Sequence, residues 1–242
     1  MGRDLSGTVA VITGASAGIG EAIARDFAEA GVRLLLVARR ADRLAALAES
    51  LPVAVETLAI DVAEPVSAQR MLDTALARFG RVDALINNAG IFRVGTVDSF
   101  DLDALGPMIA LNYEAVVRAS YVFARAMKAQ GGGAIVNISS IGANLTTAAA
   151  GVYGGLKRAV EIFSDSLRVD LAGTGVRVGI VAPGTTATEV FDHLPAASRP
   201  GAGSPVTPLL PADVAAAVRF LLEQPEHANI PHLRIYSSGQ QH

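Results

Sequence analysis

The sequence has no cysteine, and this absence excludes disulfide bonds, thiolate catalysis and zinc sites with cysteine ligands. Histidine is also scarce, and none of the four imidazoles has a close partner at metal-ligand spacing, so we expect no metal site. We expect these side chains at the surface or in loops: His193, His227, His232 and His242.

The net charge is small as well. The formal net charge is −3 and the basic residues are scattered, so the protein should carry no field that attracts nucleic acid or acidic membranes. No segment approaches the roughly 18 uninterrupted apolar residues that span a bilayer. Residues 1–14 run from a short charged start into a glycine-rich motif and lack the cleavage site of a signal peptide. We therefore expect a cytoplasmic protein with no membrane partner.

Apolar residues, by contrast, make up 51% of the 242 residues, enough to bury a large core. Short β-branched runs alternate with segments of helical period such as 19–30 and 69–79, and most of these runs are continuously apolar, which is typical of strands covered on both faces. The seven predicted strands are 9–12, 34–37, 53–58, 84–86, 134–138, 176–181 and 233–236. This alternation predicts one α/β domain over residues 1–242, a doubly wound Rossmann fold with a seven-stranded parallel sheet flanked by helices.

The clearest predicted helix follows Tyr153. Its apolar side chains recur at helical spacing, at Leu156, Val160, Phe163, Leu167 and Leu171. The charged side chains, which this spacing turns to another face, are Arg158, Glu161, Asp165 and Arg168. Residues 185–211 differ from the rest, because they are rich in proline, glycine and alanine and are too long for an ordinary connection. They predict either a substrate-binding lid or an irregular surface excursion.

Residues 13–20 read Thr-Gly-Ala-Ser-Ala-Gly-Ile-Gly between the first predicted strand and the first predicted helix. Glycines at this place allow a tight turn and a close approach of a pyrophosphate, with the amides of the helix N-terminus facing the anion. The spacing departs from the general dinucleotide fingerprint, so on this motif alone a glycine turn without function remains an alternative.

The second predicted strand ends with Val37-Ala38-Arg39-Arg40. A site for NAD would place a carboxylate there, on the ribose 2′-hydroxyl. Two guanidinium groups in its place favour the 2′-phosphate of NADP(H), which arginine grips bidentately. The alternative is a solvated helix start, although basic residues near a helix N-terminus are mildly unfavourable.

Tyr153 and Lys157 lie four residues apart on one predicted helix, so both side chains can reach a common ligand. A phenol with a pKa near about 10 is a poor base at neutral pH, but a neighbouring cation stabilises the phenolate and lowers that pKa. The pair predicts proton transfer with a small molecule, although such pairs also arise by chance.

In their order and spacing, the motifs together resemble the short-chain dehydrogenase/reductase family over essentially the whole length. The elements that carry the resemblance are residues 13–20, Asp61-Val62, Asn87-Asn88-Ala89-Gly90, Asn112, Asn137-Ile138-Ser139-Ser140, Tyr153 with Lys157, and Pro183-Gly184 followed by Thr188. Many of these polar residues come directly after different predicted strands. Ligands of open α/β sheets bind at such carboxyl ends, which supports the resemblance.

The resemblance implies an NADP(H)-dependent oxidoreductase, a carbonyl reductase, that moves hydride reversibly between the cofactor and a small ketone, aldehyde, hydroxy acid or alcohol. It implies that Tyr153 donates the proton, that Ser140 orients the substrate oxygen, that Lys157 also holds the nicotinamide ribose, and that Asn112 holds a relay water. The cofactor-binding residues it implies are Gly14, Ser16, Gly18, Ile19, Gly20, Arg39, Arg40, Asp61, Val62, Asn88, Ala89, Gly90, Tyr153, Lys157, Pro183, Gly184 and Thr188. Among them, Asp61 would contact the adenine, Asn88 and Ala89 the adenosine side, and Thr188 the nicotinamide carboxamide.

The sequence departs from the family pattern in places. Gly155 and Leu156 replace the usual Ala-Ser before the lysine, and Ala17 stands where NADP-binding members often carry a basic residue. Residues 229–240 look like the end of a subgroup that acts on small hydroxy acids or aldehydes. The substrate should contact residues 142–152, 92–97 and 185–211, with His193 the most suggestive polar group, and this composition favours a modestly hydrophobic carbonyl or alcohol.

Two other functions stay open on the sequence: an NADP-binding regulatory protein without activity, and a non-redox enzyme on the same fold, such as a dehalogenase or an epimerase. The resemblance also implies a homodimer or homotetramer built on the helices around Asn112 and Tyr153.

Overall fold

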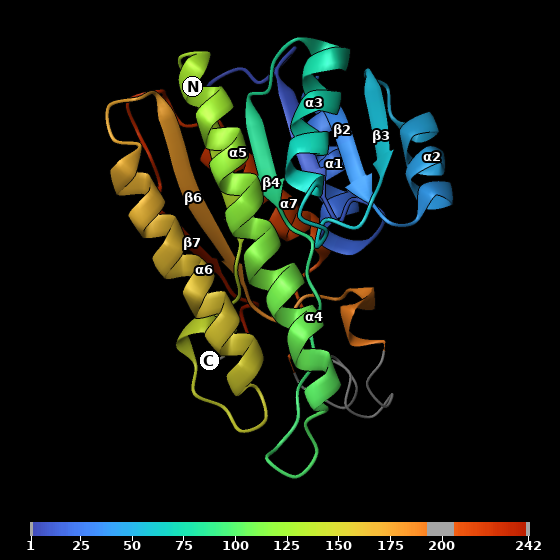
Figure 1. Ribbon diagram of the computed structural model, residues 1–242, viewed down its shortest axis with the longest axis vertical. Helices are drawn as coiled ribbons and strands as arrows, with labels where there is room; N and C mark the ends of the chain where they lie inside the picture. The colour runs from blue at the N-terminus through green and yellow to red at the C-terminus, as the bar shows by residue number, and fades with distance from the viewer. Residues whose placement is uncertain (1, 193–205, 241–242) are drawn as a thin grey trace.

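The computed structural model describes residues 2–192 and 206–240, and a seven-stranded sheet forms its centre (Figure 1). The strands lie in the order β3-β2-β1-β4-β5-β6-β7, and neighbouring strands are parallel. They are β1 (Val9–Thr13), β2 (Arg33–Ala38), β3 (Val55–Ala59), β4 (Ala84–Asn87), β5 (Gly133–Ile138), β6 (Val176–Pro183) and β7 (His232–Ile235). The predicted doubly wound Rossmann arrangement is therefore confirmed.

Each strand lies within two residues of its predicted position. The prediction was wrong about the surroundings of β3, however, which was expected to be covered on both faces. β3 is the edge strand next to β2, and its residues are only partly buried or exposed. An edge strand has a neighbour on one side only, so its side chains receive less cover than those of β1 or β4.

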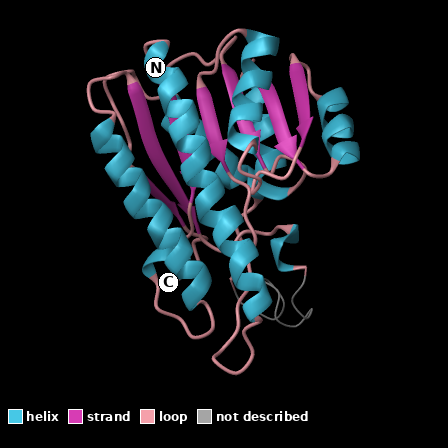
Figure 2. Ribbon diagram, in the orientation of Figure 1, coloured by secondary structure: helices cyan, strands magenta, loops and turns pink. Residues whose placement is uncertain are grey.

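Helices cover both faces of the sheet (Figure 2). One core lies under α1 (Gly18–Glu29), α2 (Ala41–Ser50) and α7 (Pro211–Leu222). The other lies under α3 (Ser67–Phe79), α5 (Ala115–Ala129) and α6 (Gly151–Asp170). Neighbouring side chains of β1 alternate between the two cores: Ile12 belongs to the first and Val11 to the second.

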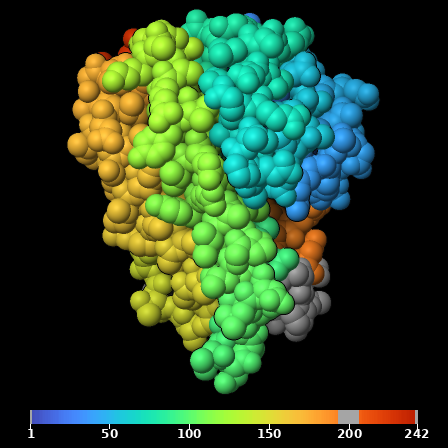
Figure 3. Space-filling model, in the orientation of Figure 1, coloured from blue at the N-terminus to red at the C-terminus, as the bar shows by residue number. Residues whose placement is uncertain are grey.

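Five short helical segments complete the described fold: η1 (Leu102–Ala104), α4 (Leu105–Ile109), the π-helix η2 (Ala110–Glu114), η3 (Ile141–Asn144) and η4 (Glu189–Phe191). Figure 1 shows α4 and the start of α6 extending past the carboxyl ends of the strands, on the side where η4 lies, and Figure 3 shows the same tapered end in outline. Since β1 and β4 are the neighbours at which the strand order changes direction, a crevice is expected between their carboxyl ends.

The helix after Tyr153 forms as predicted, but one charged residue was assigned to the wrong side. Glu161 was expected away from the core and is fully buried in α6, whereas the apolar Ile162 is 57% exposed. The carboxylate of Glu161 accepts hydrogen bonds from Ser139, Asn144 and Arg158. Those donors explain its burial, because a carboxylate can leave water where several donors replace it.

The histidines and the predicted lid are described only in part. His232 begins β7 with its side chain 28% exposed, and its Nε2 is 3.0 Å from Asp165 Oδ2. At the two ends of the 185–211 segment, Thr186 forms a parallel β-bridge with Leu209. Residues 193–205, with His193, lie outside the described residues, as does His242. Within the described residues, no helix is both long enough and apolar enough to cross a membrane.

Candidate active site

The glycine turn after β1 packs so closely against its neighbours that a side chain on Gly14 or Gly20 would collide with them. Gly14 has a φ of +68°, and a Cβ on it would lie 2.9 Å from Asn88 Nδ2 and 2.9 Å from Ala89 Cα. A Cβ on Gly20 would collide with the Gly14 carbonyl group. The N-cap residue of α1, Ala17, provides no side-chain hydrogen bond, so the first amides of this helix remain available to an anion. The turn therefore fits a pyrophosphate.

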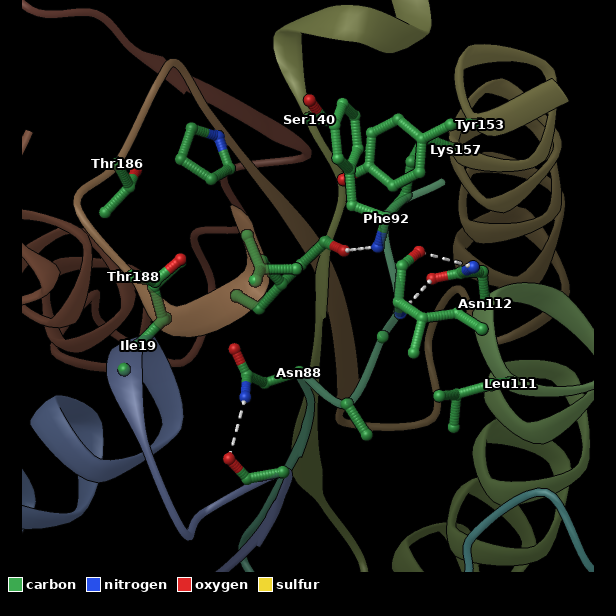
Figure 4. Close-up of a pocket in the computed structure, with 18 of the residues that line it drawn as sticks. Ile19, Asn88, Phe92, Leu111, Asn112, Ser140, Tyr153, Lys157, Thr186 and Thr188 are labelled. Atoms are coloured by element: carbon green, nitrogen blue, oxygen red, sulfur yellow. Dashed lines mark hydrogen bonds between the residues drawn. The ribbon is translucent and has the colours of Figure 1, made fainter. Parts of the chain in front are cut away.

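A hydrogen-bonded arrangement joins the ends of β1 and β4. Thr13 Oγ1 accepts hydrogen bonds from the backbone amides of Asn88 (3.0 Å) and Ala89 (3.1 Å). In return, Asn88 Nδ2 donates to the carbonyl oxygen of Thr13 over 2.9 Å. One end of the crevice is thus held by paired polar groups, which fixes where the Asn88 side chain points (Figure 4).

A cleft of about 690 Å³ opens at these strand ends. With the exception of Gly20, which packs behind the turn, every cofactor-binding or catalytic residue predicted from the sequence lines this cleft. They are Gly14, Ser16, Gly18, Ile19, Arg39, Arg40, Asp61, Val62, Asn88, Ala89, Gly90, Asn112, Ser140, Tyr153, Lys157, Pro183, Gly184 and Thr188. The residues come from six strand ends and three helices, so the fold brings distant parts of the chain to one place.

Tyr153 and Lys157 project from the first turns of α6 toward Ser140, which follows β5 (Figure 4). Ser140 lies close enough to the Tyr153 hydroxyl to influence its pKa, and Ser140 Oγ accepts a hydrogen bond from the amide of Gly142 over 3.1 Å. Lys157 Nζ donates to the Ile138 carbonyl oxygen over 2.8 Å and lies 5.9 Å from the centre of the Tyr153 ring. The phenol, the hydroxyl and the ammonium group therefore share one buried corner.

Burial controls the protonation of this corner. It raises the pKa of Tyr153 to about 12, although the neighbouring Ser140 hydroxyl acts in the opposite direction. Burial also lowers the pKa of Lys157 to about 8. The expectation that Lys157 lowers the pKa of Tyr153 is not met in this structure, because loss of water penalises the phenolate more strongly. At neutral pH, Tyr153 carries its proton.

Asn112 lies in the π-helix η2, between α4 and α5, and is fully buried. Its side chain makes two hydrogen bonds with the backbone of Ile91. Oδ1 accepts from the amide over 3.1 Å, and Nδ2 donates to the carbonyl oxygen over 3.0 Å. A Cβ on Gly90 would lie 2.8 Å from Asn112 Oδ1 and 3.8 Å from Lys157 Nζ. The wide turn of a π-helix aims one side chain inward here, a feature often found at functional sites.

The two predicted arginines differ in their surroundings. Arg39 is 73% exposed, and its nearest carboxylate oxygen, on Asp61, is 3.9 Å away. Arg40 is held more firmly, because its Nε donates to Ser16 Oγ over 3.1 Å and its NH1 donates to Glu189 over 2.9 Å. Arg43 in α2 also donates to Glu189, over 2.7 Å. Arg43 in α2 and Glu189 in η4 were not predicted from the sequence, since neither belongs to a recognisable motif.

Two aromatic residues at the other end of the cleft, Phe92 and Phe191, fall within the predicted substrate-contact ranges 92–97 and 185–211. Phe92 stands edge-on to Tyr153, with ring centroids 4.8 Å apart, and edge-on to Phe191, with centroids 5.2 Å apart. Gln240 also lines the cleft, and its Oε1 accepts from the amide of Thr185 over 3.3 Å. Within the part of the chain that the structure describes, no group of three or more His, Asp or Glu side chains could hold a metal ion.

Comparison with known proteins gives one consistent family. The family model described as short chain dehydrogenase matches residues 8–198. Sulfoacetaldehyde reductase 2 from Chromohalobacter salexigens is 36% identical over 240 residues, covering 96% of this chain and 95% of that protein. A probable NADP-dependent dehydrogenase from Haemophilus influenzae is 35% identical over 238 residues, covering 96% and 94%.

A solved structure agrees with these relatives. The crystal structure of a short chain dehydrogenase from Burkholderia cenocepacia in complex with NADP has a TM-score of 0.86 and 32% sequence identity, and the match covers 97% of this chain and 98% of that one. The fold and the cleft thus define an α/β protein with a dinucleotide-type crevice. The chain belongs to the short-chain dehydrogenase/reductase family and is an oxidoreductase of that family.

Proposed function

We propose that this protein is an NADP(H)-dependent carbonyl reductase that acts reversibly on a small ketone, aldehyde or alcohol. The observation that carries the proposal is the protonated Tyr153 hydroxyl, which lies beside Ser140 and Lys157 inside the cleft. When bound, the cofactor supplies or accepts a hydride. Residues of the glycine turn line the cleft, where the cofactor pyrophosphate would meet the first amides of α1. The NADP complex of the Burkholderia relative and the name of the Haemophilus relative support NADP as the cofactor.

The proposed mechanism assigns one task to each polar group. Ser140 and Tyr153 hold the carbonyl oxygen of the substrate by hydrogen bonds, which polarises the carbonyl group. Tyr153 then gives its proton to that oxygen as the alcohol forms. Lys157 holds the cofactor ribose and, while protonated, stabilises negative charge that develops on the phenol. Asn112 orders the backbone of Ile91 beside Lys157. It would also hold a water that links Lys157 to solvent, so that a proton returns to the site after each turnover.

In this proposal, the cofactor lies along the remaining predicted residues. Gly14, Ser16, Gly18, Ile19 and Gly20 bind the pyrophosphate side. Arg39 and Arg40 bind the 2′-phosphate, and Asp61, Val62, Asn88, Ala89 and Gly90 contact the adenosine half. Pro183, Gly184 and Thr188 contact the nicotinamide end. The predicted lid, 185–211, would cover the substrate, and its residues 193–205 lie outside the described residues. The described groups in these assignments line one cleft or flank it.

The substrate end of the cleft favours a small, modestly apolar carbonyl compound. Its lining includes Phe92, Ile141, Leu145 and Phe191, with the cation Arg93 also present. Apolar walls with a few polar groups suit a short aliphatic or aromatic aldehyde or ketone. The Chromohalobacter relative is named as a reductase of sulfoacetaldehyde, so aldehydes that carry an acidic group belong among the candidates.

A substrate panel read by NADPH absorbance tests the proposal. The panel contains short aldehydes and ketones with and without an acidic group, and NADH runs in parallel. Tyr153→Phe should lower kcat at least about 100-fold, because it removes the proton donor, while the Kd for NADPH should change less than about twofold, since only the hydroxyl is lost. Near-normal turnover by this variant would contradict the mechanism. Turnover without any change in NADPH absorbance would indicate a non-redox reaction.

We also propose a homodimer or homotetramer built on α5 and α6. The outer faces of these helices expose apolar side chains, namely Tyr121 (43%), Ile162 (57%) and Val169 (64%). Exposed apolar groups that gather on one face favour association. Light scattering coupled to size-exclusion chromatography should give two or four times the 24.9 kDa mass of the chain. The lack of cysteine suits the reducing cytoplasm, where we place the enzyme.

A further inference from the structure

An anionic side chain of the protein itself sits between two arginines beside the glycine turn. Glu189 Oε2 accepts a hydrogen bond from Arg40 NH1 over 2.9 Å, and Glu189 Oε1 accepts one from Arg43 NH1 over 2.7 Å. These hydrogen bonds, first from Arg43 and then from Arg40, hold the pKa of Glu189 below its usual value. Glu189 is therefore ionised at neutral pH, and each of its two oxygens is paired with one guanidinium group.

The place of this carboxylate matters for cofactor binding. Arg40 follows the end of β2 and also donates to Ser16 Oγ in the glycine turn over 3.1 Å. A 2′-phosphate that bound Arg40 through NH1 would compete with Glu189 for that donor, since guanidinium groups recognise carboxylates and phosphates through one kind of N–H donor. Glu189 and the phosphate are thus competitors for one anion site.

The exposure of the Glu189 ion pairs and the charge of a phosphate together favour displacement of Glu189 by the phosphate. The side chains of Glu189, Arg40 and Arg43 are 48%, 41% and 45% exposed, respectively, and ion pairs as exposed as these contribute little to stability. A phosphate monoester carries nearly twice the charge of a carboxylate and offers three acceptor oxygens. The bound carboxylate should therefore weaken phosphate binding without preventing it.

Glu189 is also tied to the substrate end of the cleft. It is the first residue of η4, whose last residue, Phe191, packs edge-on against Phe92 at 5.2 Å. Phe92 in turn packs against Tyr153 at 4.8 Å. The short helix η4 therefore connects Arg40 and Arg43, at the start of α2, to the aromatic side chains around Tyr153.

We infer that Glu189 occupies the 2′-phosphate site of the cofactor-free enzyme and is displaced when NADP(H) binds, which releases η4 from α2. Glu189 and Arg43 are then specificity-determining residues: Arg43 joins Arg40 as a ligand of the 2′-phosphate, and Glu189 sets how strongly that phosphate is preferred. The inference rests on the proposed use of NADP(H), and it adds a competing group and a third cation to that site.

Calorimetric titration with two nucleotides tests this competition without any substrate. The nucleotide 2′,5′-ADP carries the 2′-phosphate, and 5′-ADP lacks it. Glu189→Gln should bind 2′,5′-ADP about tenfold more tightly than the wild type, because the competing charge is gone. Its affinity for 5′-ADP should change less than about twofold. Arg43→Gln should weaken 2′,5′-ADP binding by about tenfold and leave 5′-ADP binding as it was.

Asp42→Asn is the matched control. Asp42 is an exposed carboxylate in the first turn of the same helix, α2, and its removal should change either affinity less than about twofold. Amide hydrogen exchange gives an independent readout: 2′,5′-ADP should speed exchange in residues 186–192 of the wild type, and 5′-ADP should not.

The outcomes separate this inference from the proposed cofactor. If wild-type protein bound both nucleotides equally, the NADP(H) proposal itself would fail. If the wild type preferred 2′,5′-ADP but Glu189→Gln bound it more weakly, Glu189 would organise the arginines instead of competing with the phosphate. An equal change for both nucleotides would show a general charge effect. Either of the last two results overturns the inference and leaves the cofactor proposal standing.

Discussion

The ring of Phe92 stands edge-on to the ring of Tyr153, with centroids 4.8 Å apart and planes at 82° (Figure 4). Phe92 follows β4 after the Asn-Asn-Ala-Gly motif and lines the cleft. This contact restricts the position of the phenol, because the hydrogens at one ring edge meet the face of the other ring. Phe92 therefore restricts the position of the Tyr153 ring, and with it the place of the hydroxyl group.

Phe92→Ala should lower kcat/KM for the best carbonyl substrate by about tenfold, since an aromatic pair of this geometry is worth roughly 0.5–1.5 kcal/mol beyond its buried area. The loss should fall on kcat as well as KM, because a mobile phenol is less often in position to donate. Steady-state kinetics at saturating NADPH measure the split. Phe100→Ala, on the same connection but absent from the cleft lining, is the comparison, and an equal loss there would point to a loosened connection instead.

The sequence predicted the sheet and most of the cleft because both depend on local patterns. Continuous apolar runs indicate the parallel strands, and ligands bind where such strands end, so the sequence alone places Asn88, Ser140 and Pro183 together. The π-helix around Asn112 could not be predicted, because its five residues have the composition of an ordinary helix. Phe92 and Glu189 depend on contacts between distant segments, which no spacing in the sequence encodes.

The pKa of Lys157 predicts a pH profile. Burial lowers that pKa to about 8, so Lys157 is charged below this pH and neutral above it. Tyr153 keeps its proton until about pH 12, so loss of the proton donor is not the first event as pH rises. The kcat/KM for carbonyl reduction should therefore be level up to about pH 7.5 and fall above about pH 8, as Lys157 loses its charge.

Stopped-flow reduction from pH 6 to 10 with saturating NADPH checks this profile. NADPH affinity is measured over the same range by fluorescence titration, so that a loss of cofactor is not mistaken for a loss of proton transfer. A rate that stays level to pH 10 would show that the charge of Lys157 does not contribute to the reductive step.

Gly14 offers a test of the cofactor cradle with a closely matched control. Gly14→Ala introduces a side chain at a φ of +68° and within 2.9 Å of Asn88 and Ala89. Gly80→Ala has nearly the same backbone conformation, with a φ of +75°, but nothing lies within 4 Å of the new Cβ. Both variants should lose about 1 kcal/mol of stability from the backbone alone.

Only Gly14→Ala should lose cofactor binding, because its new methyl group displaces the ends of β1 and β4. We expect its Kd for NADPH to rise at least tenfold, on the order of 1.4 kcal/mol, while Gly80→Ala keeps the wild-type value. Urea unfolding and fluorescence titration provide the two measurements. Equal NADPH affinities in the two variants would show that the crevice tolerates a side chain at Gly14.

Glu161 shows how a residue outside the cleft can hold the reacting groups in place. Its Oε1 accepts from Ser139 Oγ over 3.0 Å, and its Oε2 accepts from Asn144 Nδ2 over 2.9 Å and from Arg158 NH1 over 3.1 Å. Ser139 and Asn144 lie on either side of the turn that begins at Ser140. The carboxylate thus ties both ends of that turn to α6, which carries Tyr153.

Glu161→Ala should therefore lower the free energy of unfolding by about 2–4 kcal/mol, because it leaves a cavity in the interior and the buried Ser139 hydroxyl without its acceptor, whereas the exposed Asn144 and Arg158 can turn to water. Glu161→Gln keeps the volume and should lose less, about 1–2 kcal/mol, since one amide oxygen still accepts. Asp170→Asn removes an exposed carboxylate from the end of the same helix and should change stability by less than about 0.5 kcal/mol. Urea unfolding followed by circular dichroism measures all three variants.

Kinetics of the folded Glu161→Gln variant separate positioning from mere support of the fold. Its KM for the carbonyl substrate should rise several-fold, because the substitution loosens the turn that contains Ser140. The Kd for NADPH should stay constant, because the glycine turn after β1 is unaffected. A loss of stability with an unchanged KM would mean that Glu161 only supports the fold and does not position Ser140.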